Sequence, residues 1–124
     1  MFSEAQEIII DRFKHPLFSG SLEEQKQSAD GINEVCGDEV HIEIQLENGV
    51  LQKIRHTSRA CAICSASADL LAEKLEGESV STLTSLTAEQ IQEMLTIPLS
   101  PVRLKCALLP LETLRLALKI DSNS

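Results

Sequence analysis

Residues 40–57 have the sequence VHIEIQLENGVLQKIRHT, and this stretch decides the fold. From Val40 to Leu46, apolar residues alternate strictly with polar ones, which is the pattern of a strand that buries one of its faces. A second strand-like run, Val50–Thr57, follows after Glu47-Asn48-Gly49. Asn-Gly between two such runs favours a tight hairpin, because both residues tolerate the positive φ that the turn requires. The stretch therefore predicts two antiparallel strands joined by a short turn.

The chain before this hairpin predicts one helix and one short strand. Residues 4–14 carry acids early and apolar residues at helical spacing, which favours an amphipathic helix that Pro16 ends. Residues 19–31 are polar and predict a loop. We expect this loop to lead into a short strand near Ile32–Val35.

The chain after the hairpin changes to helical spacing. Residues 62–76 place their apolar side chains on one helical face, and Gly77 supplies a C-terminal stop. Thr87 and Gln90 have the spacing of a capping box, so a second helix is predicted from there through Leu95.

The last helix is predicted over the Leu-rich residues 107–120. Because Pro110 would break the interior of a helix, we expect the helix to start just after Cys106, with the proline in its first turn. The predicted order is α-β-β-β-α-α-α, a three-stranded antiparallel sheet with helices packed on it. This is an α+β fold, and we expect a single domain over residues 1–124.

The composition limits the partners of the protein. The chain has a formal net charge of −8 and contains no Trp or Tyr, so it lacks the positive footprint and the stacking platform of a nucleic-acid-binding protein. An acidic surface instead favours a basic protein partner or a cationic ligand. No run approaches the roughly 18 apolar residues of a membrane span, and the acids near the N-terminus do not fit a signal peptide. We expect a cytoplasmic protein.

Four cysteines in a reducing compartment favour metal or sulfur chemistry over disulfide bonds, although a buried Cys can also be a small core residue. Cys36 is followed by Gly37, whose backbone freedom would let Cys36 and Asp38 turn toward one point. Cys61 lies at the predicted start of the helix over residues 62–76. There the helix dipole favours a thiolate and lowers the pKa of the thiol.

The third candidate thiol, Cys106, lies at the predicted start of the last helix, beside Lys105. The charge of Lys105 also favours a thiolate. Three thiolates and a carboxylate form a plausible four-ligand set for a tetrahedral zinc ion or a [2Fe–2S] cluster. The members of this candidate set are Cys36, Asp38, Cys61 and Cys106.

Cys64 leaves more than one interpretation open. Cys61 and Cys64 form a C-x-x-C motif, which is used in thiol–disulfide redox chemistry as well as in metal binding. Cys64 could also be a reserve ligand or a small core residue. The three histidines, His15, His41 and His56, share no recognisable spacing, and we expect them at the surface rather than as ligands.

Over residues 3–121 the chain resembles the IscU/SufU/NifU N-terminal family of iron–sulfur cluster assembly scaffolds. The order and spacing of four stretches carry the resemblance: the run from His15 to Gly20, Cys36-Gly37-Asp38, Ala60-Cys61 with the small residues 65–68, and the run from Leu99 to Cys106. The family has a SufE/NifU-like fold.

The resemblance implies a scaffold rather than an enzyme. Such a protein accepts persulfide sulfur from a cysteine desulfurase, binds iron, holds a transient [2Fe–2S] cluster and passes it to apo-proteins or carrier proteins. Cys36, Cys61 and Cys106 would be the ligands, Asp38 a labile carboxylate ligand, and zinc an alternative occupant. Cys106 and Cys36 would be the persulfide acceptors, with Lys105 supporting the thiolate. The resemblance also implies a DnaK-like chaperone system as a partner. We expect the protein to be a monomer or a weak homodimer.

The departures from the family pattern keep a second function open. Lys105 stands where the IscU branch has His and is similar to the SufU branch, although the long SufU insertion is absent. Residues 99–103 only approximate the chaperone-binding motif of the IscU branch, and Cys64 is an additional thiol. The alternative is a zinc-bound, SufU-like sulfurtransferase that activates a cysteine desulfurase; a dithiol redox protein is the third hypothesis.

Overall fold

The hairpin predicted from residues 40–57 is present in the computed structural model, which describes residues 3–23 and 26–122. Strand β2 (Asp38–Glu47) pairs antiparallel with β3 (Val50–Arg59). The turn between them consists of Asn48 and Gly49, with φ angles of 55° and 75°. Both residues thus adopt the left-handed backbone that a two-residue hairpin requires.

A β-bulge corrects the side-chain alternation within β3. The register of the β2–β3 pair shifts between Gln45 and Leu46. Because the shift adds a residue to β3, Leu51 and Ile54 both point into the core, although their spacing of three would place them on opposite faces of a regular strand.

The first strand is longer than expected and begins earlier. Strand β1 spans Gln27–Asn33 and pairs antiparallel with β2, giving the sheet order β1-β2-β3. The predicted loop over residues 19–31 and strand near Ile32–Val35 were therefore wrong in their boundaries. Only Ala29 of β1 is buried, so its strand conformation comes from pairing with β2 rather than from its own hydrophobic pattern.

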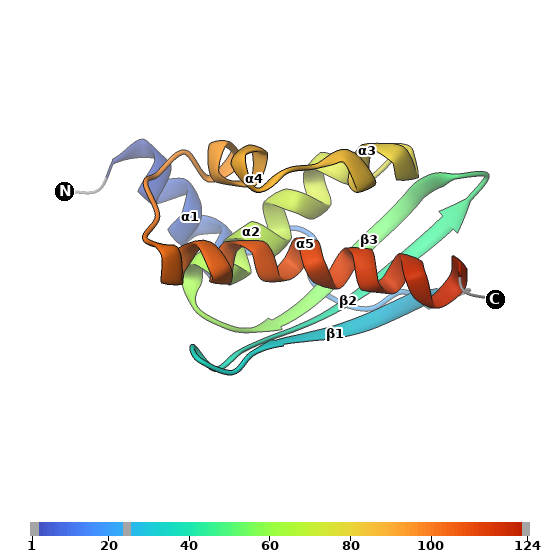
Figure 1. The fold of residues 1–124 in the computed structure, drawn as a ribbon, viewed down its shortest axis with the longest axis horizontal. Helices are drawn as coiled ribbons and strands as arrows, with labels where there is room; N and C mark the ends of the chain where they lie inside the picture. Colours follow the sequence, from blue (N-terminus) through green and yellow to red (C-terminus); the bar gives the residue numbers. More distant parts are fainter. Residues whose placement is uncertain (1–2, 24–25, 123–124) are drawn as a thin grey trace.

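Five helices lie on one side of the sheet (Figure 1). Helices α2 and α5 pack directly on the strands, while α1 packs against α2, and α4 contacts both α5 and α2. The bounds are α1 Glu4–Lys14, α2 Ala62–Leu75, α3 Val80–Ser85, α4 Ala88–Leu95 and α5 Pro101–Ser122. The α+β fold and the predicted order of elements are confirmed, with the six-residue α3 as an addition. The capping box of Thr87 and Gln90 is also present.

The last helix starts earlier than expected. Helix α5 begins at Pro101, and Pro110 lies in its interior, so the predicted start after Cys106 was wrong. Ser100 caps the helix, since its hydroxyl accepts a hydrogen bond from Arg103 N at 3.3 Å. An interior proline costs a helix about 3 kcal/mol, and burial of α5 against α2 and the sheet offsets this cost. Cys106 therefore lies in the second turn of α5. Among the described residues, no helix is long and apolar enough to cross a membrane.

Candidate metal and cluster site

The connection between β1 and β2 presents Cys36 and Asp38. Gly37 adopts a φ of 73°, and its N–H donates to Asn33 O at 2.8 Å, which closes the turn over Cys36. Cys36 is exposed at the tip of this turn. Asp38, the first residue of β2, is only 1% exposed, so its carboxylate points inward. The Cys36-Gly37-Asp38 motif thus places one thiol outside and one carboxylate inside.

Helix α2 brings Cys61 to the same carboxylate. Cys61 is the N-cap of α2, and its Sγ accepts a hydrogen bond from Cys64 N at 3.4 Å. Its own N–H donates to Asp38 Oδ1 at 2.9 Å, and its Sγ lies 3.7 Å from Asp38 Oδ2. Because Asp38 binds both the backbone and the thiol of Cys61, it fixes the start of α2 against the start of β2.

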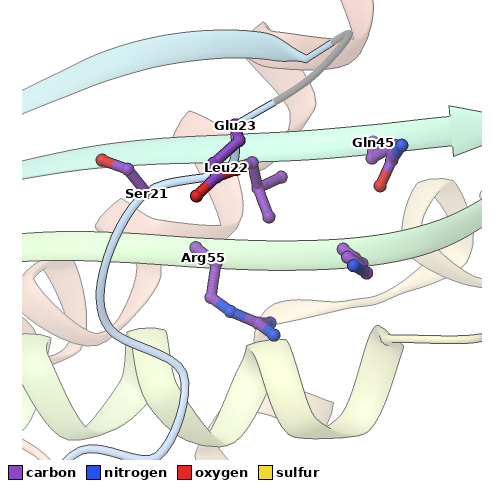
Figure 2. Close-up of a pocket in the computed structure, with 6 residues that line it drawn as sticks. Ser21, Leu22, Glu23, Gln45 and Arg55 are labelled. Atoms are coloured by element: carbon purple, nitrogen blue, oxygen red, sulfur yellow. The ribbon is translucent and has the colours of Figure 1, made fainter.

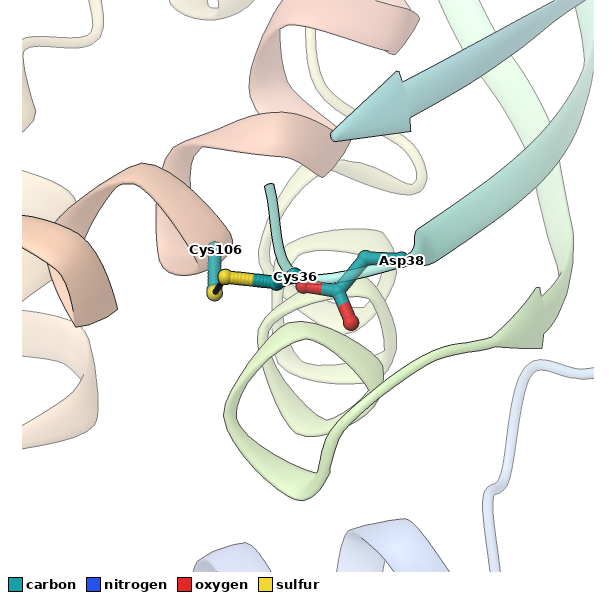
Figure 3. Close-up of side chains that lie close together, drawn as sticks. All are labelled: Cys36, Asp38 and Cys106. Carbon is teal, nitrogen blue, oxygen red and sulfur yellow. Dashed lines mark hydrogen bonds between the residues drawn. The ribbon is translucent and has the colours of Figure 1, made fainter. Parts of the chain in front are cut away.

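Helix α5 supplies the third thiol. Cys106 is fully buried, and its Sγ lies 3.3 Å from Cys36 Sγ (Figure 3). One donor atom from each of Cys36, Asp38 and Cys106 lies within 4.8 Å of the others. The four candidate ligands predicted from the sequence are therefore neighbours in space, although they come from three separate parts of the chain.

The two buried thiols, Cys64 and Cys106, have raised pKa values. Burial raises the pKa of Cys106, and hydrogen bonds to Asp38 and Cys36 raise it further. Burial also raises the pKa of Cys64, with the charge of Asp38 as a smaller cause. A thiophilic cation that binds such a site displaces the thiol protons.

Support of the Cys106 thiolate by Lys105 stays a prediction. The pKa of Cys106 is raised rather than lowered, because burial and the neighbouring acidic groups act on it most strongly. Lys105 is exposed on α5 and, with Asn33 and Val35, lines a pocket of about 550 Å³ beside the Cys36 turn.

Cys64 lies one helical turn after Cys61 and is fully buried. It packs in the hydrophobic core with Ala66 and Cys106. This location fits the small core residue that was one of the three interpretations for Cys64.

Two of the three histidines, His41 and His56, form side-chain hydrogen bonds within the fold. His15 is exposed at the C-cap of α1. His41 is half-buried on the outer face of the sheet. His56 was expected at the surface, and that prediction was wrong: its ring is buried, with Nε2 2.9 Å from Asp69 Oδ1 and Nδ1 2.9 Å from Ser58 Oγ. Strand β3 continues beyond His56, whose side chain alternates toward α2.

Asp69 of α2 is the centre of the His56 network. Burial raises the pKa of Asp69, but hydrogen bonds from His56 and from the backbone N–H groups of Leu17 and Phe18 outweigh it and lower the pKa overall. Arg12 Nη1 also donates to this carboxylate at 3.0 Å. Asp69 therefore ties the N-terminal segment to the middle of the fold, away from the cysteines.

A second pocket, of about 360 Å³, lies on the outer face of the sheet (Figure 2). Its lining residues come from the segment before β1 and from the outer rows of β2 and β3: Ser21, Leu22, Glu23, Gln45, Lys53 and Arg55. The lining contains no thiol and no histidine. This pocket therefore does not take part in the thiol chemistry predicted from the sequence.

Comparison with known proteins agrees with this geometry. The sequence profile of the NifU-like N terminal domain matches residues 4–121. The chain belongs to this family. A relative from Thermotoga maritima, the iron–sulfur cluster assembly scaffold protein IscU, is 32% identical over an alignment 135 residues long, gaps included. The alignment covers 96% of this chain and 93% of the relative. The resemblance noted from four sequence stretches is confirmed.

Solved structures place this NifU-like domain in the same fold. A crystal structure from Fervidobacterium islandicum, of a protein assigned as an iron–sulfur cluster assembly scaffold of the SUF system, has a TM-score of 0.79 and 27% identity. The match covers 95% of this chain and 96% of that one. The N-terminal part of a NifU-like protein from Brucella abortus has a TM-score of 0.76 at 20% identity, covers 95% of this chain and supports the fold alone.

The NifU-like domain contains one residue at the site that the sequence analysis did not single out. Asn33, at the end of β1, has its Nδ2 atom 4.0 Å from Cys106 Sγ and its Oδ1 atom 3.2 Å from Val35 N. An Asn before a Cys-Gly-Asp turn carries no motif of its own. Its position three residues before Cys36 was the available signal, because Asn side chains commonly bind backbone N–H groups two residues on.

Proposed function

We propose that this chain is an iron–sulfur cluster assembly scaffold. The observation that carries the proposal is the convergence of Cys36, Cys61, Cys106 and Asp38 from the β1–β2 turn, the start of α2 and the second turn of α5. Thiolates dominate the ligands of [2Fe–2S] clusters, and a weaker carboxylate ligand eases release of the cargo. Relatives named as IscU scaffolds support the same role.

The exposed thiol is the best first acceptor of sulfur. Cys36 is exposed, whereas Cys106 is buried beneath it at a sulfur–sulfur distance of 3.3 Å. In this proposal, the Cys36 thiolate attacks the terminal sulfur of a persulfide on a cysteine desulfurase. The donor's S–S bond breaks, and the donor cysteine leaves as a thiolate, so the transfer needs no external oxidant or reductant. Cys106 can then take the sulfur from Cys36 by the same step.

The spacing of the donor atoms also suits zinc as the resting occupant, which is the SufU-like alternative. A tetrahedral zinc ion with Zn–S bonds of about 2.3 Å holds its sulfur ligands about 3.8 Å apart. The donor atoms of Cys36, Asp38 and Cys106 already lie within 4.8 Å of one another, which suits a single ion. In this alternative the protein acts as a sulfurtransferase partner of the desulfurase and keeps no stable cluster.

The expected partners follow from the site and the charge. A net charge of −8 favours a desulfurase with a basic docking surface, and apo-proteins or carrier proteins would receive the cluster. The residues similar to a chaperone motif, 99–103, are mostly exposed at the start of α5, where a DnaK-like chaperone could reach them. We propose a cytoplasmic location and a monomer or weak homodimer.

Anaerobic reconstitution with iron and sulfide tests the scaffold proposal. The parent should develop the visible charge-transfer bands of a [2Fe–2S] cluster. Cys36→Ala, Cys61→Ala and Cys106→Ala should each lose them, whereas the matched control Cys64→Ala should keep them. If the three variants bind iron and sulfide as the parent does, the ligand assignment is wrong.

The same preparations separate the competing functions. Stoichiometric zinc in the purified protein, acceleration of a desulfurase and no stable chromophore would select the zinc-bound sulfurtransferase. Insulin reduction that depends on both Cys61 and Cys64 would select the dithiol redox protein.

A further inference from the structure

Asn33 contacts both sides of the cysteine site. Its carbonyl oxygen accepts a hydrogen bond from Gly37 N at 2.8 Å, and its side-chain Oδ1 accepts one from Val35 N at 3.2 Å. These two bonds close the turn that presents Cys36. The turn therefore depends on the Asn33 side chain as well as on the backbone.

The other end of the same amide faces the buried thiol. Because Val35 N is a donor, the atom that accepts from it must be Oδ1, and this leaves the NH2 group directed at Cys106. The Nδ2–Sγ distance is 4.0 Å, at the outer limit of a hydrogen bond to sulfur. Cys106 Sγ in turn lies 3.3 Å from Cys36 Sγ, so the Asn33 amide faces one member of a close pair of sulfurs.

We infer that Asn33 is a positioning residue of the metal site. This inference rests on the proposed function, since it assumes that Cys36 and Cys106 bind a metal ion or cluster as thiolates. Asn33 Oδ1 holds the turn of Cys36 at the spacing that a shared cation needs, and its NH2 group donates to the Cys106 thiolate.

A neutral amide suits this role better than a cation. It stabilises the negative charge of a buried thiolate, yet it adds no positive charge that would repel the bound metal. Hydrogen bonds to ligand sulfurs also tune metal affinity and electronic structure. Lys105, in contrast, lies on the exposed side of α5, where it can act on an incoming partner.

Titration of the metal-free, full-length chain with Co²⁺ tests the inference. Thiolate-bound Co²⁺ gives a sulfur-to-cobalt charge-transfer band, and loss of a hydrogen bond to sulfur moves this band to lower energy. Asn33→Ser keeps a side-chain oxygen that can accept from Val35 N, but it is too short to reach Cys106. We expect its band to move to lower energy and its Zn²⁺ affinity, measured by chelator competition, to fall about 10–100-fold.

Asn48→Ser in the β2–β3 turn is the matched control, because it changes an Asn of the other hairpin. It should leave both the cobalt band and the Zn²⁺ affinity unchanged. Thermal unfolding of the metal-free variants by circular dichroism should show that Asn33→Ser is folded at the temperature of the titration.

The outcomes separate the inference from the proposed function. If Asn33→Ser has the cobalt band and the Zn²⁺ affinity of the parent, the inference is overturned while the site stands. A fall in affinity with an unshifted band would also overturn it, since Asn33 would then only shape the turn. If the parent itself gives no thiolate–cobalt band, the ligand set behind the proposed function is wrong.

Discussion

The two hairpin turns of the sheet are held in different ways. The β2–β3 turn, Asn48-Gly49, is closed by left-handed backbone and is anchored by backbone bonds to the segment after α2: Val80 N donates to Gly49 O at 2.8 Å, and Leu51 N to Glu78 O at 2.8 Å. The β1–β2 turn depends on side chains as well as on the left-handed backbone of Gly37. Asn33 Oδ1 accepts from Val35 N, and the Asp38 carboxylate accepts from Cys61 N.

This difference between the two turns indicates at which end of the sheet the identity of a side chain affects the cysteine site. Backbone bonds tolerate many side chains, so the β2–β3 end can change without consequence for the cysteines. At the β1–β2 end, individual side chains determine both the local structure and the spacing of the thiols. Structure and function are therefore coupled at one end of the sheet and separate at the other, and each prediction below tests that contrast.

The largest effect is expected at Asp38, the first residue of β2, and Glu47 at the other end of the strand is its control. Asp38→Ala removes a candidate ligand and the acceptor of the Cys61 N–H. We expect Zn²⁺ affinity to fall at least about 10–100-fold and the metal-free unfolding free energy to fall by about 1–3 kcal/mol. Glu47→Ala, at the exposed other end of the strand, should change stability by less than about 0.5 kcal/mol. Chelator competition and urea unfolding measure the two quantities.

The Asp38 prediction fails if both variants bind zinc equally. Asp38→Asn refines it, because the amide keeps an oxygen that can accept from Cys61 N but loses the charged ligand. That variant should recover most of the stability and little of the zinc affinity.

The second prediction concerns the support beneath the first turn. Gly31 of β1 lies against α5, and a Cβ atom added there would be 2.0 Å from Thr113 Oγ1. Because Thr113 is buried and cannot move away freely, Gly31→Ala should destabilise the protein by about 1–3 kcal/mol. The measurement is the midpoint of urea unfolding.

A double variant shows whether this contact is the cause. Thr113→Ala removes the Oγ1 atom, so Gly31→Ala with Thr113→Ala should be less destabilised than the sum of the two single variants. Additive losses would show that the close approach is not the source of the effect.

A matched pair of glycines gives the third prediction. Gly37 and Gly49 have φ angles of 73° and 75°, and an added Cβ atom would meet nothing within 4 Å at either position. Replacement by Ala should therefore cost each turn a similar roughly 1–2 kcal/mol of left-handed strain. Only Gly37→Ala should alter the cobalt spectrum, because only that turn carries a thiol. Equal spectra for the two variants would remove the distinction between the turns.

The elements that the sequence predicted correctly have strong local signals. The β2–β3 hairpin has strict alternation and Asn-Gly, and Thr87 caps α4 with Gln90 as expected. Strand β1 was misplaced because its sequence, QSADGIN, has no hydrophobic alternation and forms a strand only beside β2. Helix α5 was shortened because Pro110 opposes a helix locally, whereas the packing that offsets this cost involves distant residues.

The site was predictable in its members but not in its geometry. Cys36, Cys61 and Cys106 could be singled out from their element ends and from the family pattern. Their distances depend on how α5 crosses the sheet, and Cys36 and Cys106 are 70 positions apart in the sequence, which leaves no local signal for this. Asn33 was missed for the same reason, because only the folded chain brings Cys106 close to its amide group.

The smallest predicted effect on stability is that of His41, a residue of β2 between the two turns. Its Nδ1 is 2.8 Å from Asp30 Oδ1 on β1, and its Nε2 is 3.0 Å from Glu43 Oε2. Hydrogen bonds to Asp30 and then Glu43 raise the pKa of His41 above its ordinary 6.5 despite partial burial. On β3, Thr57 pairs with His41, and Arg55 and Arg59 lie two residues to either side of Thr57. A further basic group, Lys26, donates a hydrogen bond to Glu43.

The sign of the pH effect follows from the raised pKa. The folded state binds the His41 proton more tightly than the unfolded state, so its stabilisation is complete below pH 6.5 and is lost as the pH rises through the raised pKa. Because the ring is 36% exposed, solvent screening limits the effect to a few tenths of a kcal/mol. Between about pH 6 and pH 8, the unfolding free energy of the parent should decline more than that of His41→Gln. The difference between the two declines should be these few tenths of a kcal/mol.

Comparing the two proteins isolates His41, because His15 and His56 are present in both. Added salt should shrink the difference between the curves, since the ion pairs lie on the outer face of the sheet. Parallel stability curves at low salt would show that His41 does not link β1 to β2 electrostatically. Zinc affinity should be the same in both proteins, because His41 lies between the two turns and contacts neither.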